Sequence, residues 1–228
     1  MIRGYIGLLG MGKTISMVND SIDALRKGQK VITNTPFAWR FERKFNKENP
    51  NYKVLNGKEY YVPTFIDNPT QFKKALFNET NCLICIDEAS ILLSSYDWQK
   101  MSLDFIMKFA QARKYGLDIF YTSQGFNHTV KRLRDLTNEV VACKKYMPFG
   151  FNFITNTTYD PDFFAQRVIA NSTAENKYVL KRKTIYSGRL KKLYSAYDTM
   201  FKVGSNMLTD EEKAVHNLPS VDLTQFIK

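Results

Sequence analysis

Eight residues near the start of the chain have the composition of a phosphate-binding loop. Residues 7–14 read GLLGMGKT, which fits the pattern G-x-x-x-x-G-K-[ST]. Glycines let such a loop fold around an anion, so that successive backbone N–H groups converge on phosphate oxygens. A helix that begins at the end of the loop adds the partial positive charge of its N-terminus, about half an elementary charge. The motif therefore predicts that a nucleotide binds here.

Two side chains of the loop are suited to phosphate and metal chemistry. Lys13 can reach the β- and γ-phosphates of a nucleotide, and the Thr14 hydroxyl can bind Mg²⁺. A glycine-rich turn that merely precedes Lys-Thr is the alternative, and the predicted strand and helix on either side disfavour it. The residues expected to contact the nucleotide are Gly7, Leu9, Gly10, Met11, Gly12, Lys13, Thr14 and Ile15.

A pair of acids follows an apolar run, CLICI at residues 82–86. An acidic residue at the C-terminal end of a strand beside the loop lies where a parallel sheet forms its ligand crevice. Asp87 would hold Mg²⁺, directly or through a water, and Glu88 would act as general base on the attacking water. The alternative for Glu88 is a capping or ion-pairing role. Since kinases use the acceptor substrate as nucleophile, a base at Glu88 favours hydrolysis.

Further polar residues could complete a catalytic site. Gln124 follows a predicted strand, where it could touch the γ-phosphate or orient water, and Ser123 is the alternative. Charge that develops on the γ-phosphate also needs a cation. Arg113 is favoured as a finger that reaches a neighbouring subunit. Arg132 and Arg134 are the other candidates, and each arginine could instead pair with a carboxylate or with DNA phosphate.

Alternating strands and helices must position these residues. Repeated βα units predict an α/β fold, a P-loop NTPase whose mainly parallel sheet has helices on both faces. From residue 144 onward, strand-like pieces predict antiparallel additions at the sheet edge, and residues 40–62 read as an excursion from the core. We expect a single ATPase domain over 1–228, with a core at 1–143 and an extension and tail at 144–228. Strands are expected at 2–7, 30–33, 82–86 and 117–123, and helices at 13–27, 69–80, 101–115 and 129–140.

The charge balance favours a polyanionic partner. The chain has 33 Lys and Arg against 22 Asp and Glu, a formal net charge of +11. A lysine-rich codon bias would give the same count without a partner. One basic run could hold the DNA backbone without reading sequence, or could be a solvated hairpin face. It comprises Lys181, Arg182, Lys183, Arg189, Lys191 and Lys192.

Other site classes find little support. Cys82 and Cys85 form a C-x-x-C, but their odd spacing in a buried strand points them to opposite faces of the sheet. The three cysteines and two histidines offer no second pair spaced for zinc. The chain has no run of about 18 uncharged apolar residues, so the sequence predicts no transmembrane helix. It predicts no signal peptide either, because Lys13 interrupts the apolar stretch near the N-terminus.

Several segments, taken in order, resemble the ATPase domain of zonula occludens toxin (Zot)-like proteins. The resemblance covers residues 2–143, and RKYGLDIFYTSQ is its more specific part. RLKKLYSAYDT at 189–199 is also similar to the tyrosine-rich end of that domain. These proteins include the filamentous-phage assembly ATPase and lie close to the FtsK–HerA class of DNA motors, which includes viral packaging ATPases. The segments are GLLGMGKT, VITNTPF, ICIDEAS, FAQARKYGLDIFYTSQ and KRLRDL.

The resemblance implies roles for individual residues. By it, Lys13 and Thr14 bind nucleotide and metal, Asp87 binds metal, Glu88 is the base and Gln124 is the sensor. Where many relatives have an HRH-like triplet, this chain has ARK at 112–114, so the arginine finger is the weakest part of the match. The chain also lacks the membrane span that filamentous-phage assembly proteins carry after this domain.

The resulting hypothesis is an ATP- and Mg²⁺-dependent motor that translocates viral DNA during genome packaging or virion assembly. It would work as a homo-oligomeric ring in the host cytoplasm or on the virion, with a virion vertex or membrane protein as a further partner. One alternative is a membrane-docked, Zot-like morphogenesis ATPase that acts on protein partners. A small-molecule kinase is the remaining alternative, and Glu88 argues against it.

Overall fold

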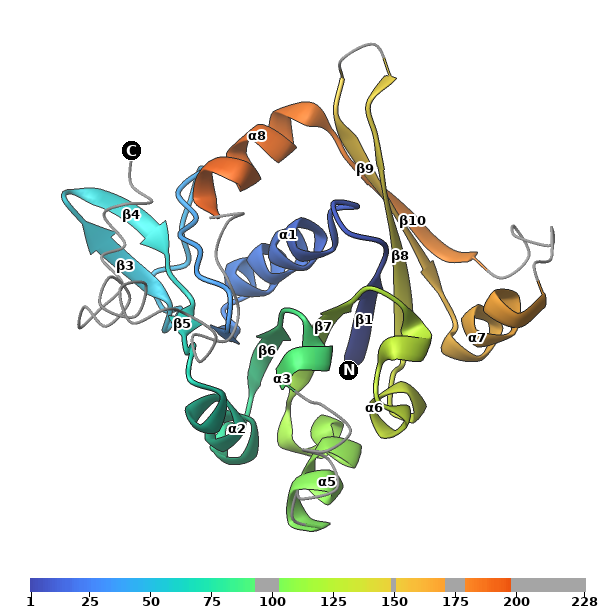
Figure 1. Cartoon of the computed structure of the whole chain (residues 1–228). Helices are drawn as coiled ribbons and strands as arrows, with labels where there is room; N and C mark the ends of the chain where they lie inside the picture. Colours follow the sequence, from blue (N-terminus) through green and yellow to red (C-terminus); the bar gives the residue numbers. More distant parts are fainter. Residues whose placement is uncertain (93–102, 149–150, 171–178, 198–228) are drawn as a thin grey trace, which may run out of the picture.

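A computed structural model describes residues 1–92, 103–148, 151–170 and 179–197 (Figure 1). Its main sheet has eight strands in the order β10-β9-β8-β1-β7-β6-β2-β5. Strands β8, β1, β7, β6, β2 and β5 run parallel, whereas β9 and β10 are antiparallel additions at one edge. This confirms the predicted fold class. The strands are β1 (Ile2–Ile6), β2 (Lys30–Thr33), β5 (Thr64–Phe65), β6 (Cys82–Ile86), β7 (Asp118–Ser123), β8 (Glu139–Tyr146), β9 (Phe153–Tyr159) and β10 (Val179–Ile185).

Helices cover both faces of this sheet (Figure 1). One face packs against α1 (Lys13–Arg26) and α8 (Ser187–Ala196), which share a buried core cluster with it. The other face has its own core cluster, to which the remaining helices contribute. Those helices are α2 (Pro69–Asn78), α3 (Ala89–Leu92), α5 (Leu103–Ala110), α6 (Lys131–Asp135) and α7 (Pro161–Ala170).

Helix α1 follows the periodicity of its apolar residues. Ile15, Val18, Ile22 and Leu25 form one buried stripe along it, at the spacing expected of a helix with one face on a sheet. Gly28 comes two residues after the helix with φ of 86°, a conformation that favours glycine and ends the helix.

The two cysteines of the C-x-x-C lie on opposite faces of the sheet, as their odd spacing predicts. Cys82 belongs to the core cluster beneath α2, whereas Cys85 belongs to the cluster beneath α1. Burial raises the pKa of both thiols, that of Cys82 to about 11. Both are therefore neutral core side chains at ordinary pH.

Residues 40–62 form a separate unit that packs on the core. Strands β3 (Tyr52–Leu55) and β4 (Lys58–Tyr61) pair antiparallel in a two-stranded sheet of their own. The segment thus leaves the main sheet, as expected, but Phe45 and Tyr61 join the core cluster on the α1 face. The sequence interpretation of the segment as an excursion missed this packing, because its aromatic residues follow no strand or helix period.

Two predicted helices are shorter in the structure. The helix expected over 129–140 ends at Asp135, because the chain from Glu139 onward pairs with β1 as strand β8. The helix expected over 101–115 is α5 followed by a 3₁₀ turn, η1 (Ala112–Tyr115). Of the extension and tail expected at 144–228, residues 198–228 lie outside the described residues. Among the residues that are described, no helix has the length and apolar character needed to cross a membrane.

Candidate active site

The glycine-rich loop connects β1 to α1 and needs its glycines for two reasons. Gly10 and Gly12 have φ of 76° and 86°, in the left-handed region that other residues rarely adopt. Gly7 lies so close to β8 that an added Cβ would stand 2.8 Å from the carbonyl oxygen of Cys143. A Met11 N–H donated to the Leu8 carbonyl, at 3.2 Å, closes the loop.

The N-terminus of α1 is prepared for an anion. Gly12 occupies the cap position, no side chain caps the helix, and its first turn contains no acidic residue. The first N–H groups of any α-helix have no acceptor within the helix, so those of Lys13, Thr14 and Ile15 are available to a ligand. The side chain of Leu9 is 81% exposed and that of Ile15 is buried in the core. Ile15 can therefore serve a nucleotide only through its backbone.

Two threonine hydroxyls converge on the carboxylate of Asp87. Thr14 at the start of α1 donates to Oδ1 of Asp87 at 2.9 Å, and Thr122 of β7 donates to the same oxygen at 2.7 Å. The register of the sheet explains the second contact, because Ile86 pairs with Tyr121 and the next residues lie side by side. Thr14 of the loop and Asp87 are therefore in direct contact, and their roles at a metal stay predictions.

Asn34 fixes the backbone of Asp87 from the other side. Its Nδ2 donates to the Asp87 carbonyl at 3.0 Å, and the Asp87 N–H donates to its Oδ1 at 2.7 Å. Asn34 follows β2, the strand next to β6, so both residues lie at the carboxyl edge of the sheet. Sequence reasoning assigned no role to Asn34 or Thr122. The one available signal was a polar residue at the end of a predicted strand.

The buried charges of the site influence one another. Lys13 is 5% exposed and donates from Nζ to the Leu8 carbonyl at 3.3 Å. Burial raises the pKa of Asp87, and the hydrogen bonds from Thr122 and Thr14 and the charge of Lys13 oppose that rise. A cation placed at this carboxylate would stabilise its charged form.

Glu88 has an unusual backbone conformation. Its φ is 50°, in the left-handed region, and its N–H donates to the Thr122 hydroxyl at 2.8 Å. Non-glycine residues held in this region often mark functional sites, where surrounding contacts maintain the strain. Burial, and secondly the charge of Asp87, raises the pKa of Glu88. A carboxylate with a raised pKa is a stronger proton acceptor, which suits a general base.

The donor set at Asp87 fits Mg²⁺. Hydroxyl and carboxylate oxygens are ligands that Mg²⁺ prefers. Adjacent ligands of an octahedral Mg²⁺ with bonds of 2.0–2.1 Å lie about 2.9 Å apart, and Thr14 Oγ1 and Asp87 Oδ1 are 2.9 Å apart. The buried Thr35 hydroxyl adjoins Asp87 without a partner of normal hydrogen-bond geometry, a polar atom that a metal-bound water would satisfy.

The sensor candidates lie at the same edge of the sheet. Gln124 directly follows β7 and is exposed, one strand away from both the loop and Asp87. Ser123 is buried and donates its hydroxyl to the Gly125 carbonyl at 3.0 Å, within its own turn. The placement favours Gln124 over Ser123, and its role as sensor stays a prediction.

The structure does not bring Arg113 to the loop of its own chain. Arg113 is exposed in η1, which precedes the amino end of β7, and it borders a surface pocket with Met1 and Ile2 at the start of β1. It therefore lies at the opposite edge of the sheet from the loop. Arg134 donates to Asn127 at 3.0 Å, and Arg132 is exposed on α6.

The basic run of the C-terminal part divides into two groups. Lys183 pairs with Asp20 and Asp23 of α1 at 2.8 and 3.2 Å, and Arg189 lies 4.1 Å over the Trp39 ring. These two residues hold β10 and α8 to the rest of the fold. The four exposed members are Lys181, Arg182, Lys191 and Lys192.

A family comparison agrees with this geometry. Residues 1–192 match the family model described as zonular occludens toxin (Zot). The chain belongs to the Zot family. The resemblance inferred from its motifs is thereby confirmed. No curated protein sequence matches this Zot-family chain.

Solved structures similar to this chain include another Zot domain. The N-terminal domain of zonular occludens toxin from Neisseria meningitidis is 17% identical, with a TM-score of 0.48, covering 86% of this chain and 98% of that one. The genome packaging NTPase of Sulfolobus turreted icosahedral virus 2, in complex with ATP-gammaS, is 14% identical, with a TM-score of 0.45, covering 72% and 93%. The flagellar accessory protein FlaH from Methanocaldococcus jannaschii is 13% identical, with a TM-score of 0.43, covering 70% and 76%.

Proposed function

We propose that this Zot-family protein is an Mg²⁺-dependent ATPase that translocates viral DNA during genome packaging or virion assembly. The observation that carries the proposal is the contact between Thr14 of the loop and Asp87 beside Glu88. It supports the proposal because it joins the loop to the acidic pair at one edge of the sheet, where the loop would bind phosphates, Asp87 would bind a metal and Glu88 would act as base. In this proposal the chain is one ATPase domain, with a catalytic core at 1–143 and an extension at 144–228.

Each side chain would have a distinct task. The N–H groups of the loop and the ammonium of Lys13 would bind the phosphates, and Thr14 and Asp87 would hold Mg²⁺, which supplies charge stabilisation at the β- and γ-phosphates. Glu88 would accept the proton of the attacking water. Its left-handed backbone, whose N–H donates to Thr122, turns the chain two residues after the end of β6, directly after Asp87.

An oligomeric ring would complete the site. Transition-state charge on the γ-phosphate needs a cation besides Lys13. Because Arg113 lies at the far edge of the sheet, it would serve only the site of a neighbouring subunit. The formal charge of +11 and the exposed residues Lys181, Arg182, Lys191 and Lys192 suit sequence-independent contacts with the DNA backbone.

The decisive experiment measures ATP hydrolysis with and without DNA on particles of known mass. We expect hydrolysis to require Mg²⁺, to increase when DNA is added and to be a property of the oligomer. The substitution Lys13→Ala should abolish it. If DNA leaves the rate of ATP hydrolysis unchanged but a virion or membrane protein increases it, a role in morphogenesis would replace DNA translocation. Phosphate transfer to a small acceptor would replace both with a kinase.

A further inference from the structure

The hairpin formed by β8 and β9 ends in exposed apolar side chains. Figure 1 shows this hairpin projecting past α8 and the start of α1. At its tip the side chains of Tyr146, Met147 and Phe151 are 43%, 66% and 68% exposed. Apolar side chains that gather on a surface mark places where a protein meets another protein or a membrane. The tip therefore has the character of a contact surface.

The hairpin is braced close to this tip. Tyr146 pairs with Phe153 in the β8–β9 ladder, and their rings stack with centroids 5.3 Å apart and an interplanar angle of 19°. Beyond this pair, the Phe151 N–H donates to the Pro148 carbonyl at 2.9 Å. Cross-strand aromatic pairs stabilise an antiparallel ladder. The fold itself therefore presents the apolar side chains outward.

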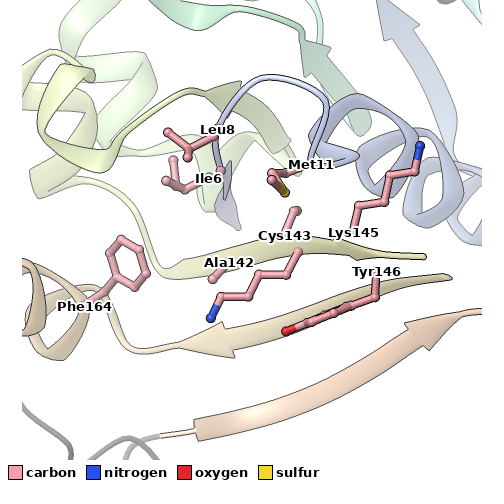
Figure 2. Close-up of a pocket in the computed structure, with 10 residues that line it drawn as sticks. Ile6, Leu8, Met11, Ala142, Cys143, Lys145, Tyr146 and Phe164 are labelled. Atoms are coloured by element: carbon pink, nitrogen blue, oxygen red, sulfur yellow. The ribbon is translucent and has the colours of Figure 1, made fainter. Parts of the chain in front are cut away.

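Lysines follow the apolar tip at a short distance along the hairpin. Lys144 precedes Met147 by three residues, which corresponds to about 10 Å of extended strand. Figure 2 shows Lys145 and Tyr146 on opposite sides of β8. The Lys145 ammonium lies 5.9 Å over the ring of Tyr194 of α8, so α8 continues this surface away from the tip. The hairpin thus carries an apolar end and a cationic band behind it.

The segments that build this end of the molecule carry charge of one sign. The sequence has no Asp or Glu over 140–159 or over 176–197, whereas both ranges contain lysines. The second range includes α8, on which Lys191 and Lys192 are exposed. It also includes Tyr186, which is 70% exposed and directly follows β10, whose last residue pairs with Ile154 of β9. These segments offer cations and aromatic rings to a partner, and no carboxylate.

We propose that the β8–β9 tip inserts into the surface of an anionic lipid bilayer. Interfacial anchors bury their apolar side chains about 5–10 Å into the boundary between headgroups and acyl chains. With Met147 and Phe151 at that depth, Lys144 and Lys145 lie level with the lipid phosphates, which attract lysine near an anionic surface. Tyrosine is enriched at the same level of a bilayer, which suits Tyr146.

Two other occupants fit the tip less well. DNA offers phosphates, but the outermost side chains, Met147 and Phe151, have no group that could donate a hydrogen bond to them. A second copy of the same tip would bring two sets of lysines together. The inference goes beyond the proposed function and is independent of it, because insertion involves neither a nucleotide nor DNA.

The first test measures binding of the full chain to lipid vesicles by sedimentation. One set contains equal parts of phosphatidylcholine and phosphatidylglycerol, and the other contains phosphatidylcholine alone. Wild type should bind the anionic vesicles more tightly. Met147→Ser and Phe151→Ser keep the charge and should each weaken this binding about tenfold. Lys145→Gln should weaken it about fivefold on the anionic vesicles.

The β3–β4 hairpin supplies the matched controls. Val54 of β3 is 56% exposed, and Lys58 of β4 is exposed beside it in the same hairpin. Val54→Ser and Lys58→Gln should therefore leave vesicle binding unchanged. All of these side chains are at the surface, so each variant should unfold in urea as wild type does.

A second measurement detects insertion itself. Phe151→Trp keeps an apolar side chain at the tip and adds a fluorophore. Its emission should shift to the blue on anionic vesicles and be quenched by lipids brominated in their acyl chains, whereas that of Val54→Trp should do neither. An unquenched Phe151→Trp variant, or full vesicle binding by both serine variants, would overturn the proposal, since the net positive charge alone would then explain the binding.

The serine variants also decide between the other occupants. Loss of DNA affinity with vesicle binding kept would assign the tip to nucleic acid, and a changed particle mass with vesicle binding kept would assign it to a subunit contact. Either result would overturn membrane insertion. ATP hydrolysis without vesicles should equal that of wild type in both variants. Failure of the membrane proposal would therefore leave the ATPase proposal intact.

Discussion

The hydroxyl of Thr14 donates a 2.9 Å hydrogen bond to Oδ1 of Asp87, joining residues 73 positions apart in the chain. One belongs to the first turn of α1 and the other follows β6, so the contact ties the phosphate loop to the acidic end of a strand that is not its neighbour. The oxygens lie at the separation of adjacent Mg²⁺ ligands. Removal of the hydroxyl should therefore act mainly on metal binding.

Substitutions at Thr14 test this directly. Thr14→Ser keeps the hydroxyl and should keep Mg²⁺-dependent hydrolysis within a few-fold, whereas Thr14→Val removes it and should lower kcat by about tenfold or more. The measurement is ATP turnover as a function of Mg²⁺ concentration. Equal turnover in the valine and serine variants would show that the hydroxyl holds no metal.

Glu88→Gln should separate binding from chemistry. The amide keeps the size of the side chain but cannot accept a proton, so turnover should fall about a hundredfold or more while ATP still binds. Glu79→Gln is the control, since Glu79 pairs with Lys30 near the start of β6, away from the loop. Near wild-type hydrolysis by Glu88→Gln would mean that another group is the base.

The pH profile of turnover should report the same carboxylate. Because burial and Asp87 raise the pKa of Glu88 above its ordinary 4.5, the proton acceptor is lost as pH falls through a value above 4.5. We expect kcat/KM, which reports groups of the free protein, to decline on the acid side with an apparent pKa above 4.5. A decline only below that value would contradict the assignment.

Asp87→Asn should stabilise the free protein while it removes activity. The pKa of Asp87 is raised in the folded state, so folding favours its protonated form, and this contribution is lost as pH rises from 3.8 through the folded pKa. Wherever Asp87 is ionised, its carboxylate is a buried charge that disfavours folding, and an amide would remove that charge. We expect a gain of about 1 kcal/mol in the free energy of unfolding without metal, measured by urea denaturation, and no Mg²⁺-dependent hydrolysis. A loss of stability would show that the charge is well compensated.

Asn34→Ala should displace Asp87 without touching substrate. The variant loses both hydrogen bonds to the Asp87 backbone and should lower stability by about 2 kcal/mol. It should also raise the Mg²⁺ concentration needed for half-maximal turnover, an effect that general destabilisation would not give. Asn127→Ala, which loses only a surface contact with Arg134, should do neither. An unchanged Mg²⁺ requirement in Asn34→Ala would limit Asn34 to packing.

Local sequence signals predict the elements of the site but not its cross-strand contacts. The glycines predict the loop, and the spacing of apolar residues predicts helix α1. The acids that follow the CLICI run predict the position of Asp87. Each of these signals is a property of one short segment. Asn34 and Thr122 act on Asp87 only because β2, β6 and β7 lie side by side, an order that no single segment encodes. The left-handed φ of Glu88 is likewise imposed by its surroundings, since its N–H is held by Thr122.

A side chain at Gly12 should destabilise the protein. The same substitution at Gly57 shows how much of the loss of stability comes from steric overlap rather than from backbone strain. Gly12 has φ of 86° and its added Cβ would overlap Ile154 of β9, whereas Gly57, in the β3–β4 turn, has φ of 73° with nothing within 4 Å. Gly57→Ala should therefore lose only about 1 kcal/mol of stability from backbone strain. Gly12→Ala should lose clearly more, since the buried Ile154 side chain must also shift. Urea unfolding of both variants measures the difference, and equal losses would show that the Ile154 side chain shifts at no cost and that only backbone strain opposes a side chain at Gly12.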